Sequence, residues 1–589
     1  MNSATNLFNM SQTKEPLYLK SKMIMNQENK KRNYRFFLFL LLITLLLSIN
    51  SHAEEKKFSI QKYKQIGLVW GLLKYHHPEI SNGKHNWDIE FIKLIDNVEN
   101  IQNQDNFNDF LLNYITNLNT KSEIKKINVK QLFLKNVDYE WIDPTIFGDK
   151  LTNLLLSIKE NGNIKNYYCS SSKLSKMLSF ENEVGFKDFN YTIKSHRLLL
   201  LYSFWNVMQY WNVNKYLMDE KWSACLDAMT NEFIDCKTNL EFEILKSKLI
   251  SKLNDSHSYF LSSVVYDSLF KYKPVFSVKS INDSLLINSI YNISLAKKDN
   301  IELGDVIVKI NGENIKTNTN LKLKSILSVS NSNSLKRFSN WLFFNNTDSI
   351  NIDIVKKNGK QINQYIHLYH KYIDEQPVYL GKKNNNTWSF INPNIAYINL
   401  EQITKKELSS AFKQISNTKG LILDLRNYPK DISNEDLADF LYPERKEFIK
   451  VLFPIVNTPS YGEYDGDAPL KKLINPFQLG SNNPDYYKGK VILLVNNSTI
   501  SKAEYFGMTI QQAPNCITIG EQTSGSVMNI VSYTLPDKSV VNFTGLGAFY
   551  PNGEEVQRKG LRIDYYVKET VKKYDPELYI KEAIRIIEN

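Results

Sequence analysis

The sequence is poor in the residues that hold metals or build disulfide frameworks. Its 589 residues include four cysteines and eight histidines. The cysteines show no CxxC spacing and no Cys/His ligand pattern, which argues against a zinc site. In an exported protein Cys225 and Cys236 could form a disulfide, or all four cysteines, including Cys169 and Cys516, could be small buried side chains.

A metal or cofactor site has little other support in the sequence. The adjacent pair His76–His77 has the right side chains for a ligand set. No carboxylate or third histidine stands at helical spacing from this pair, and a metal site needs three or four ligands. The sequence therefore predicts no metal and no cofactor.

The chain also lacks a concentrated basic surface. Its formal net charge of +11 comes mostly from lysines dispersed among asparagines. Outside the N-terminus there is no dense basic block and no arginine-rich stripe, the features with which proteins contact nucleic-acid phosphates. The charge pattern favours a solvated surface, and no nucleic-acid partner is expected.

The apolar run from Phe36 to Ile49 is too short to span a bilayer comfortably, which takes about 20 residues. It follows the basic segment 29–35 and precedes Ser51-His52-Ala53, a small-x-small pattern. This order predicts a secretory signal peptide over residues 1–53, cut after Ala53, and an exported protein that is periplasmic, extracellular or associated with the cell envelope. No cysteine stands at the cleavage site, so lipid anchoring there is not expected. An uncleaved membrane anchor is the alternative.

At this length the chain is expected to form about three or four domains. Residues 54–265 are predicted to be mainly helical and to contain an internal repeat, because an aromatic pattern occurs twice with an interval of 17 residues between its tryptophans. Its members are Trp70, Tyr75 and Trp87 in one copy and Trp205, Tyr210 and Trp222 in the other. These aromatics are predicted to pack between helices. A substrate groove lined by them is the alternative.

Two further parts follow the helical region. Residues 266–372 show short strands with turn signals, above all the strand 306–310 and the hairpin turn Asn311-Gly312, which favours a β-rich binding module. Residues 373–589 alternate strands and helices and predict an α/β layered core with a mainly parallel sheet. The fold class is thus multidomain α/β.

The stretch 491–512 carries the strongest chemical signal in this core. An apolar strand, Val491 to Val495, is followed by a polar loop and then by Ser501 directly before a helical pattern. Helix N-terminal N–H groups stabilise an oxyanion, so a serine there is well placed as a nucleophile. The same residues also read as a capping box, in which Ser501 pairs with Glu504.

His257 is the candidate general base. It follows Asn254-Asp255-Ser256 in a turn after a helix that is predicted to end near Leu253. Small polar neighbours, Ser256 especially, can fix the tautomer of a histidine, which a general base requires. A loop histidine with local hydrogen bonds is the alternative.

Together these segments resemble the tail-specific (C-terminal-processing) serine peptidase family, most closely the secreted branch found in Bacteroidetes, which is related to the tricorn core peptidase. The resemblance rests on WGLLKYHHP, LNDSHSYF, ELGDVIVKINGENI, LILDLRNYP, STISKAEYF with IGEQTSG, and FYPNGEEVQRKGLRID. It implies a PDZ-like module over residues 266–372, a ClpP/crotonase-like peptidase core and peptide or protein substrates.

The resemblance also implies residue roles. Ser501 would be the nucleophile, and backbone N–H groups of Lys502 and of about Lys430 would form the oxyanion hole. Many relatives carry a glycine pair at the second of these positions, where this chain has Pro429-Lys430-Asp431. Ser526 occupies the position of the catalytic lysine of the bacterial processing peptidases, so a Ser–Lys dyad of that kind is excluded.

The remaining implied roles follow the tricorn-like arrangement, in which a Ser-His pair acts with a glutamate. Ser256 and His257 match the pair, and Gln557 stands where the glutamate is expected. Gln557 can orient a histidine by hydrogen bonding but cannot stabilise an imidazolium by charge.

Three functions are compatible with these residues. The first is an exported serine endopeptidase with Ser501 as nucleophile and His257 as base. The second is a catalytically degenerate peptide-binding or scaffolding protein on the same fold, because fold does not dictate function. The third is a hydrolase of another ester or amide that uses the same serine.

Overall fold

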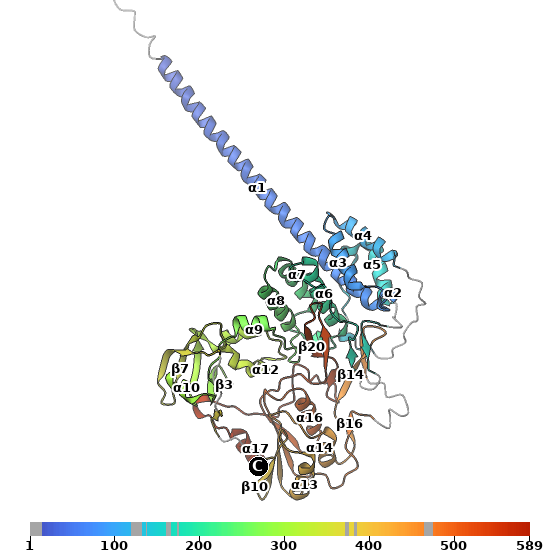
Figure 1. Cartoon of the computed structure of the whole chain (residues 1–589), viewed down its shortest axis with the longest axis vertical. Helices are drawn as coiled ribbons and strands as arrows, with labels where there is room; N and C mark the ends of the chain where they lie inside the picture. Colours follow the sequence, from blue (N-terminus) through green and yellow to red (C-terminus); the bar gives the residue numbers. More distant parts are fainter. Residues whose placement is uncertain are drawn as a thin grey trace, which may run out of the picture.

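The computed structural model of the chain describes residues 14–118, 132–136, 138–160, 166–172, 176–370, 376–381, 386–463 and 475–589. Its first element is one long helix, α1 (Lys14–His76), which projects away from the rest of the molecule (Figure 1). The helix passes without a break through the position of the predicted cleavage after Ala53. Side chains from Phe36 to Leu42 are exposed along it. No helix of the described residues is long and apolar enough to cross a membrane.

The helical region packs around the C-terminal part of α1. Its other α-helices are α2 (Pro78–Ser81), α3 (Trp87–Asn97), α4 (Gln104–Thr116), α5 (Pro144–Glu160), α6 (Lys194–Trp211), α7 (Cys225–Asp235) and α8 (Asn239–Ser251). Short elements between them are η1 (Leu134–Asn136), β1 (Ser170–Ser171), β2 (Leu178–Ser179), η2 (Lys215–Leu217) and η3 (Trp222–Ala224). Helix α6 is buried on almost every side because it lies at the centre of this region.

The predicted repeat is present in the packing. The Trp70 indole N–H donates to the Trp87 carbonyl oxygen (2.8 Å) and the Trp87 indole donates back to the Trp70 carbonyl oxygen (3.0 Å). Trp205 and Trp222 make the same exchange, at 3.1 and 3.0 Å. All four side chains are buried. The aromatics of the repeat are therefore core residues, as predicted.

The histidine pair and the cysteines also lie in buried positions. His76 Nε2 contacts the Tyr139 hydroxyl at 2.9 Å, and His77 Nδ1 accepts the backbone N–H of Glu79 at the start of α2. Burial lowers the pKa of His76 to about 3 and that of His77 to about 4. Cys225 and Cys236 are both free thiols, so the alternative of small buried side chains is the one observed for them.

The β-rich module contains an antiparallel sheet in the order β3-β4-β5-β7-β8. Its strands are β3 (Phe276–Ile281), β4 (Ser284–Ile290), β5 (Val306–Ile310), β6 (Glu313–Asn314), β7 (Ser349–Val355), β8 (Gln361–His367) and β9 (Val378–Tyr379). Helical elements cover it: α9 (Ser263–Leu269), α10 (Ile293–Lys298), α11 (Ile315–Asn318), η4 (Thr319–Lys324), α12 (Ser332–Leu335) and η5 (Lys336–Leu342). Asn311 and Gly312 form the predicted turn, both with positive φ.

The boundaries of this module were predicted at residues 266 and 372. The first falls inside α9, where Val265 is buried in the hydrophobic core of the module. The second lies outside the described residues.

The C-terminal core is built on a six-stranded sheet in the order β10-β11-β12-β17-β18-β22, in which β10 alone runs antiparallel to its neighbour. The strands are β10 (Trp388–Asn392), β11 (Ile395–Asn399), β12 (Gly420–Asp424), β17 (Lys490–Val495), β18 (Cys516–Gly520) and β22 (Tyr565–Tyr566). Its helices are α13 (Lys405–Ile415), α14 (Asn434–Leu441), α16 (Lys502–Ile510), η6 (Val571–Lys573) and α17 (Leu578–Glu588).

Alternate side chains of the central strands point to opposite faces of this sheet and pack against different helices. Leu421, Leu423 and Leu493 pack with α13, α14 and α16. Ile422 and Ile492, one residue along in each strand, pack against α17 on the opposite face. Because helices cover both faces, the central strands read as continuous apolar runs in the sequence.

A second set of strands joins the core to the helical region: β13 (Lys446–Glu447), β14 (Lys450–Ile455), β15 (Ser460–Glu463), β16 (Gln478–Leu479), β19 (Ile530–Thr534), β20 (Val540–Thr544) and β21 (Gly547–Phe549). The hairpin β19–β20 reaches the helices, as Figure 1 shows. Its residues Tyr533 and Phe543 are buried in the same hydrophobic core as α1 and α6. The helical region therefore fixes the end of β20, where Thr544 lies.

Candidate active site

Ser501 lies at the end of the loop between β17 and α16, with φ 56° and ψ −120°. Such a backbone conformation costs a non-glycine residue about 1–3 kcal/mol and persists only where the surroundings impose it. Here the Ser501 N–H donates to the carbonyl oxygen of Ser526 at 2.8 Å. The Ser501 hydroxyl makes no capping bond to α16 and has no hydrogen-bond partner in the described part of the chain. It is thus presented freely at a helix N-terminus.

The Ser501 half of the predicted capping box is not formed, because the Ser501 side chain makes no capping bond to α16. The Glu504 side chain is fully buried and turns toward the loop 523–526. Its carboxylate accepts the Thr523 hydroxyl (2.5 Å) and the backbone N–H groups of Gly525 (2.6 Å) and Ser526 (2.8 Å). Burial raises the pKa of Glu504 to about 7, although these donors act in the opposite direction. Glu504 holds the loop that in turn holds the Ser501 backbone.

The two predicted oxyanion donors lie on neighbouring segments. Lys502 is the first residue of α16, and its backbone N–H has no acceptor among the described residues. The turn after β12 lies against it, because the Lys502 ammonium donates to the Lys430 carbonyl oxygen at 3.2 Å. The Lys502 side chain also lies over the Phe506 ring, at 5.3 Å from its centroid.

His257 is buried in the turn after α8. Its Nδ1 lies 2.8 Å from the Thr544 hydroxyl at the end of β20. Its Nε2 is buried and has no hydrogen-bond partner in the described structure. Burial lowers the pKa of His257 below its usual range, the nearby Asp255 carboxylate acts in the opposite direction, and Arg337 lowers the pKa further. The imidazole is therefore neutral near pH 7.

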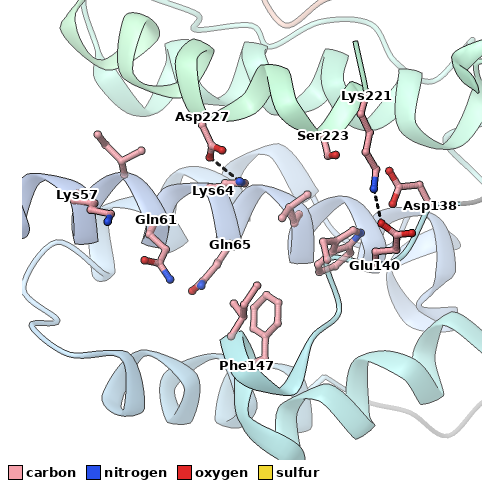
Figure 2. A pocket seen from close by; sticks show the side chains of 14 residues that line it. Lys57, Gln61, Lys64, Gln65, Asp138, Glu140, Phe147, Lys221, Ser223 and Asp227 are labelled. Carbon is pink, nitrogen blue, oxygen red and sulfur yellow. Dashed lines mark hydrogen bonds and ion pairs between the residues drawn. The ribbon is translucent and has the colours of Figure 1, made fainter. Parts of the chain in front are cut away.

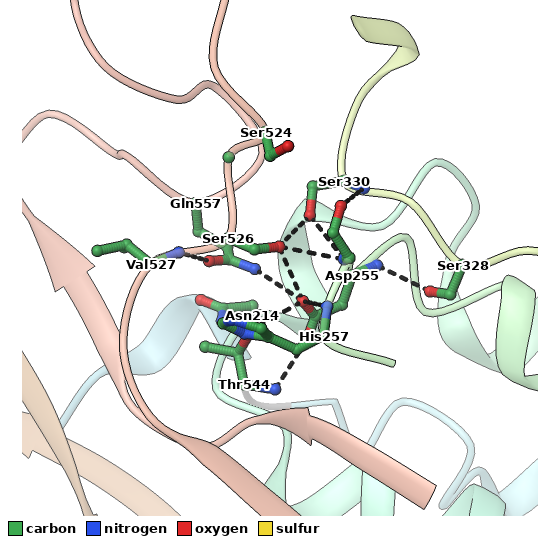
Figure 3. Close-up of polar contacts among 12 residues, drawn as sticks. Asn214, Asp255, His257, Ser328, Ser330, Ser524, Ser526, Val527, Thr544 and Gln557 are labelled. Atoms are coloured by element: carbon green, nitrogen blue, oxygen red, sulfur yellow. Dashed lines mark hydrogen bonds and ion pairs between the residues drawn. The ribbon is translucent and has the colours of Figure 1, made fainter. Parts of the chain in front are cut away.

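Ser526 connects the Ser501 turn with the His257 turn, and Figure 3 shows its hydroxyl beside Asp255 and Ser330. Its carbonyl oxygen accepts the Ser501 N–H. Its hydroxyl accepts the backbone N–H of Ser256 (3.1 Å), contacts the Ser330 hydroxyl (2.5 Å) and donates to Asp255 Oδ1 (3.1 Å). Three separate parts of the chain thus meet at one buried hydroxyl. No hydrogen bond joins Ser501 and His257 themselves in the described structure.

Ser256 and Gln557, both predicted to act on His257, form their hydrogen bonds with other groups. The Ser256 hydroxyl accepts the backbone N–H of Ser330 (3.0 Å), so Thr544 rather than Ser256 contacts the imidazole. The Gln557 amide accepts the Val527 N–H (3.3 Å) and donates to Asp255 (3.4 Å). Both residues lie in the cluster, but neither orients the histidine directly.

Asp255 and Thr544 lie against His257, and sequence reasoning assigned neither of them to the candidate site. Asp255 stands in the predicted turn, where only its spacing from His257 sets it apart from other polar turn residues. Thr544 is 287 residues from His257 along the chain, at the end of an ordinary strand. The Asp-x-His spacing was the one available signal for Asp255, because a carboxylate near a histidine is a common device for orienting it.

The cluster is separate from a cavity of about 590 Å³ in the helical region. That cavity lies between α1, α5 and the segment around η3 and α7, and ion pairs of Lys64 with Asp227 and of Lys221 with Glu140 border it (Figure 2). None of the predicted site residues lines it. Among the described residues, no group of three or more His, Cys, Asp or Glu side chains is arranged to hold a metal ion.

Comparison with known proteins places the core in a family. The family model for peptidase family S41 matches residues 394–567, which run from β11 to β22 and include Ser501, Ser526 and Gln557. This part of the chain is a peptidase family S41 domain. The predicted resemblance to the C-terminal-processing peptidases is thereby confirmed.

Individual relatives agree with this assignment. The carboxy-terminal processing protease CtpA of Bacillus subtilis (strain 168) is 23% identical over 289 residues, which are 48% of this chain and 53% of the relative. The chain thus spans about half the length of this curated relative. Mature CPAF, solved in complex with lactacystin, superposes with a TM-score of 0.51 at 11% identity, over 66% of this chain and 96% of CPAF. This likeness shows a shared fold.

A third similar structure is the photosystem II D1 C-terminal processing protease. It is 16% identical, with a TM-score of 0.36, over 67% of this chain and 97% of that protein. The agreement with CPAF extends beyond the S41 domain. The mixed architecture, a helical N-terminal region and a β-rich module before the S41 domain, is therefore that of a multidomain α/β protein, as predicted.

Proposed function

We propose that this S41 protein is an exported serine peptidase, with Ser501 as nucleophile and His257 as general base. The observation that carries the proposal is the strained Ser501 turn, whose free hydroxyl stands at the N-terminus of α16. Through Ser526, this turn is bonded to the turn of a buried histidine with an unpaired Nε2. Nucleophile and base on adjoining turns are the arrangement that acyl transfer requires.

In the proposed reaction His257 Nε2 takes the proton of the Ser501 hydroxyl as Oγ attacks the carbonyl carbon of a peptide bond. The C–N bond then breaks, and the imidazolium gives the proton to the leaving amine. Water, deprotonated by His257, hydrolyses the acyl-enzyme and restores Ser501. General acid–base catalysis of this kind contributes about 100- to 10,000-fold.

The oxyanion of the tetrahedral intermediate is assigned to the backbone N–H groups of Lys502 and Lys430. Support comes from the free Lys502 N–H at the helix start and from the bond that holds the Lys430 turn against Lys502. Each donor of such a pair is worth about 3–4 kcal/mol of transition-state stabilisation. The side chain of Lys430 points to Glu401 and takes no part.

Two further parts of the proposal concern substrate and compartment. The β-rich module is proposed to act as a PDZ-like domain that adds a peptide strand to a sheet edge, for which β3 and β8 are available. The basic segment and apolar run before Ala53 support export with cleavage of residues 1–53. Sequencing the N-terminus of the protein recovered from its native cells tests the cleavage.

A peptide-binding protein without turnover is the competing function. It is favoured by two observations: Ser501 and His257 share no hydrogen bond, and Gln557 brings no charge to the cluster. Tight peptide binding that is unchanged in Ser501→Ala, with no product from the wild type, would establish it. An esterase would instead hydrolyse activated esters and leave peptides intact.

The test is cleavage of a diverse peptide library, read by mass spectrometry, with the protein that begins after Ala53. We expect wild type to cut and both Ser501→Ala and His257→Ala to lose cleavage by at least about 1,000-fold while keeping the thermal transition of wild type. Full activity in either folded variant would overturn the proposed roles. The cut sites would show whether a free C-terminus is required.

A further inference from the structure

Asp255 is a buried carboxylate that the proposed mechanism does not yet use. It is 4% exposed and lies two residues before His257. Its Oδ1 accepts the backbone N–H of His257 (3.1 Å), the Ser526 hydroxyl (3.1 Å) and the Gln557 amide (3.4 Å), and its Oδ2 accepts the Thr544 N–H (2.7 Å). Every one of these partners is a donor, which an acceptor-only carboxylate suits.

Asp255 holds both the backbone and the ring of His257. Besides accepting the His257 N–H, it fixes the backbone of Thr544, whose hydroxyl lies 2.8 Å from Nδ1. If Nδ1 donates to that hydroxyl, the lone pair is on Nε2, the nitrogen that the proposed mechanism needs. The carboxylate itself lies 3.9 Å from Nδ1. Opposite charges at this distance in a buried site interact strongly.

Gln557 complements this arrangement because it is neutral. Its amide N–H donates to Asp255 while its carbonyl oxygen accepts the Val527 N–H. A glutamate at this position would bring a second carboxylate into contact with Asp255 in a buried site, where two like charges are costly. The charged groups that act on the His257 ring are then Asp255 on its own turn and Arg337 from η5, with opposite effects.

We propose that Asp255 is the positioning carboxylate of the Ser501–His257 pair. It stabilises the imidazolium that forms during proton transfer and, through Thr544, fixes the ring for Nε2 to act. Gln557 adds no second negative charge beside Asp255. This role rests on the proposed function, since it presumes that His257 carries a proton during turnover.

The first test is the titration of His257 itself, which needs no turnover. Labelled histidines are followed by NMR from pH 4 to 8, and the His257 signals are assigned by their loss in His257→Gln. We expect Asp255→Asn to lower the pKa of His257 by about one unit or more, because a favourable charge is removed. Gln557→Glu is expected to raise it, because a negative charge is added. A purely structural Asp255 would leave the titration of His257 unchanged in folded Asp255→Asn and would overturn the proposal.

The second test compares kinetics on a peptide that wild type cleaves. We expect Asp255→Asn to lower kcat by about 10- to 100-fold with little change in KM, and to move the acid limb of kcat/KM to lower pH. The double variant Asp255→Asn/Gln557→Glu, which returns one negative charge to the cluster, is expected to recover part of the loss. Equal losses in the single and the double variant would contradict the charge role.

These tests separate the inference from the function on which it rests. If wild type cleaves nothing, the peptidase proposal fails, while the NMR titration still decides whether Asp255 controls His257. If Asp255→Asn lowers the thermal transition so far that it does not fold, the same titration in Asp255→Ser, which also removes the charge, decides. An unshifted titration of His257 in folded Asp255→Ser would then overturn the inference.

Discussion

The helical repeat and the Ser526 cluster are both buried and both depend on hydrogen bonds, but they are built differently. Each tryptophan exchange joins two residues 17 positions apart. The cluster joins Ser526 to Ser330 across 196 residues and to Ser256 across 270. The hydrogen bonds of the repeat thus join residues close in sequence and lie among apolar side chains. The cluster forms only when three parts of the fold have assembled.

This difference separates a region that stabilises the fold, the tryptophan repeat, from a region proposed to carry the chemistry, the Ser526 cluster. The tryptophan pairs stabilise one region and touch no reacting group. The cluster contains buried polar groups. A buried polar group that lacks a hydrogen-bond partner lowers the free energy of unfolding. Substitutions in the cluster are therefore expected to change activity more than stability, and substitutions in the repeat to do the reverse.

The largest effect is expected for Glu504→Gln. The new amide would place an N–H group against one of the three donors that the carboxylate now accepts, so the loop 523–526 would shift and with it the backbone of Ser501. We expect cleavage to fall by about 100- to 1,000-fold, the range for a lost oxyanion donor. Glu435→Gln, at an exposed position of α14, is the matched control. Wild-type rates in Glu504→Gln would show that the loop does not position Ser501.

The repeat is tested by the pair Trp87→Phe and Trp222→Phe. Each removes one indole hydrogen bond to a buried carbonyl oxygen and part of a buried ring, at a cost of about 1–3 kcal/mol in the free energy of unfolding. Denaturant titration measures the cost, and peptide cleavage at 25 °C is expected to stay within about twofold of wild type. If one variant lost stability and the other did not, the two units would not be equivalent.

A smaller loss of activity is expected for Thr544→Val. The substitution keeps the shape of the side chain and removes the hydroxyl that lies against His257 Nδ1. We expect kcat to fall by about 10-fold, because the tautomer of the ring is no longer fixed. Thr544→Ser, which retains the hydroxyl, is the control and should remain near wild type. Identical kcat values in Thr544→Val and wild type would mean that the contact has no role in turnover.

The smallest expected effect is on the pH dependence of stability. Because the pKa of Glu504 is raised to about 7 from an ordinary 4.5, the folded state binds more protons than the unfolded state between these values. The contribution of Glu504 to stability is thus full below about pH 4.5 and is lost as pH rises through about 7, at no more than about 1.4 kcal/mol per pH unit.

Urea titrations at pH 5 and pH 7 measure this contribution. The decrease in the free energy of unfolding between the two pH values should be larger in wild type than in Glu504→Gln by about 1–3 kcal/mol. An equal decrease in both proteins would show that Glu504 does not titrate in this range.

Much of the fold could be predicted because its signals are local. The strand expected at 306–310 is observed as Val306–Ile310. The apolar runs of β12 and β17 reflect burial on both faces of the sheet. The interval of 17 residues between tryptophans is also a local signal, and both pairs make the same exchange of hydrogen bonds.

The site was predicted less completely because its contacts are not local. Ser501 and His257 were indicated by their turns, but the Ser501 half of the capping box is not formed, and the loop 523–526 offers Glu504 three donors that the local sequence does not show. Asp255 and Thr544 acquire their place only when β20 and the turn after α8 meet. Gln557 contacts Asp255 rather than the imidazole, which the order of residues along the chain could not reveal.

The most direct test of the central claim is the covalent labelling of Ser501. A fluorophosphonate reacts with serine hydroxyls that an adjacent base activates, and the adduct is located by peptide mass mapping. We expect one adduct in wild type, on Ser501, none in Ser501→Ala, and at least about 100-fold slower labelling in His257→Ala. An adduct on another residue, or an unchanged rate in His257→Ala, would contradict the account.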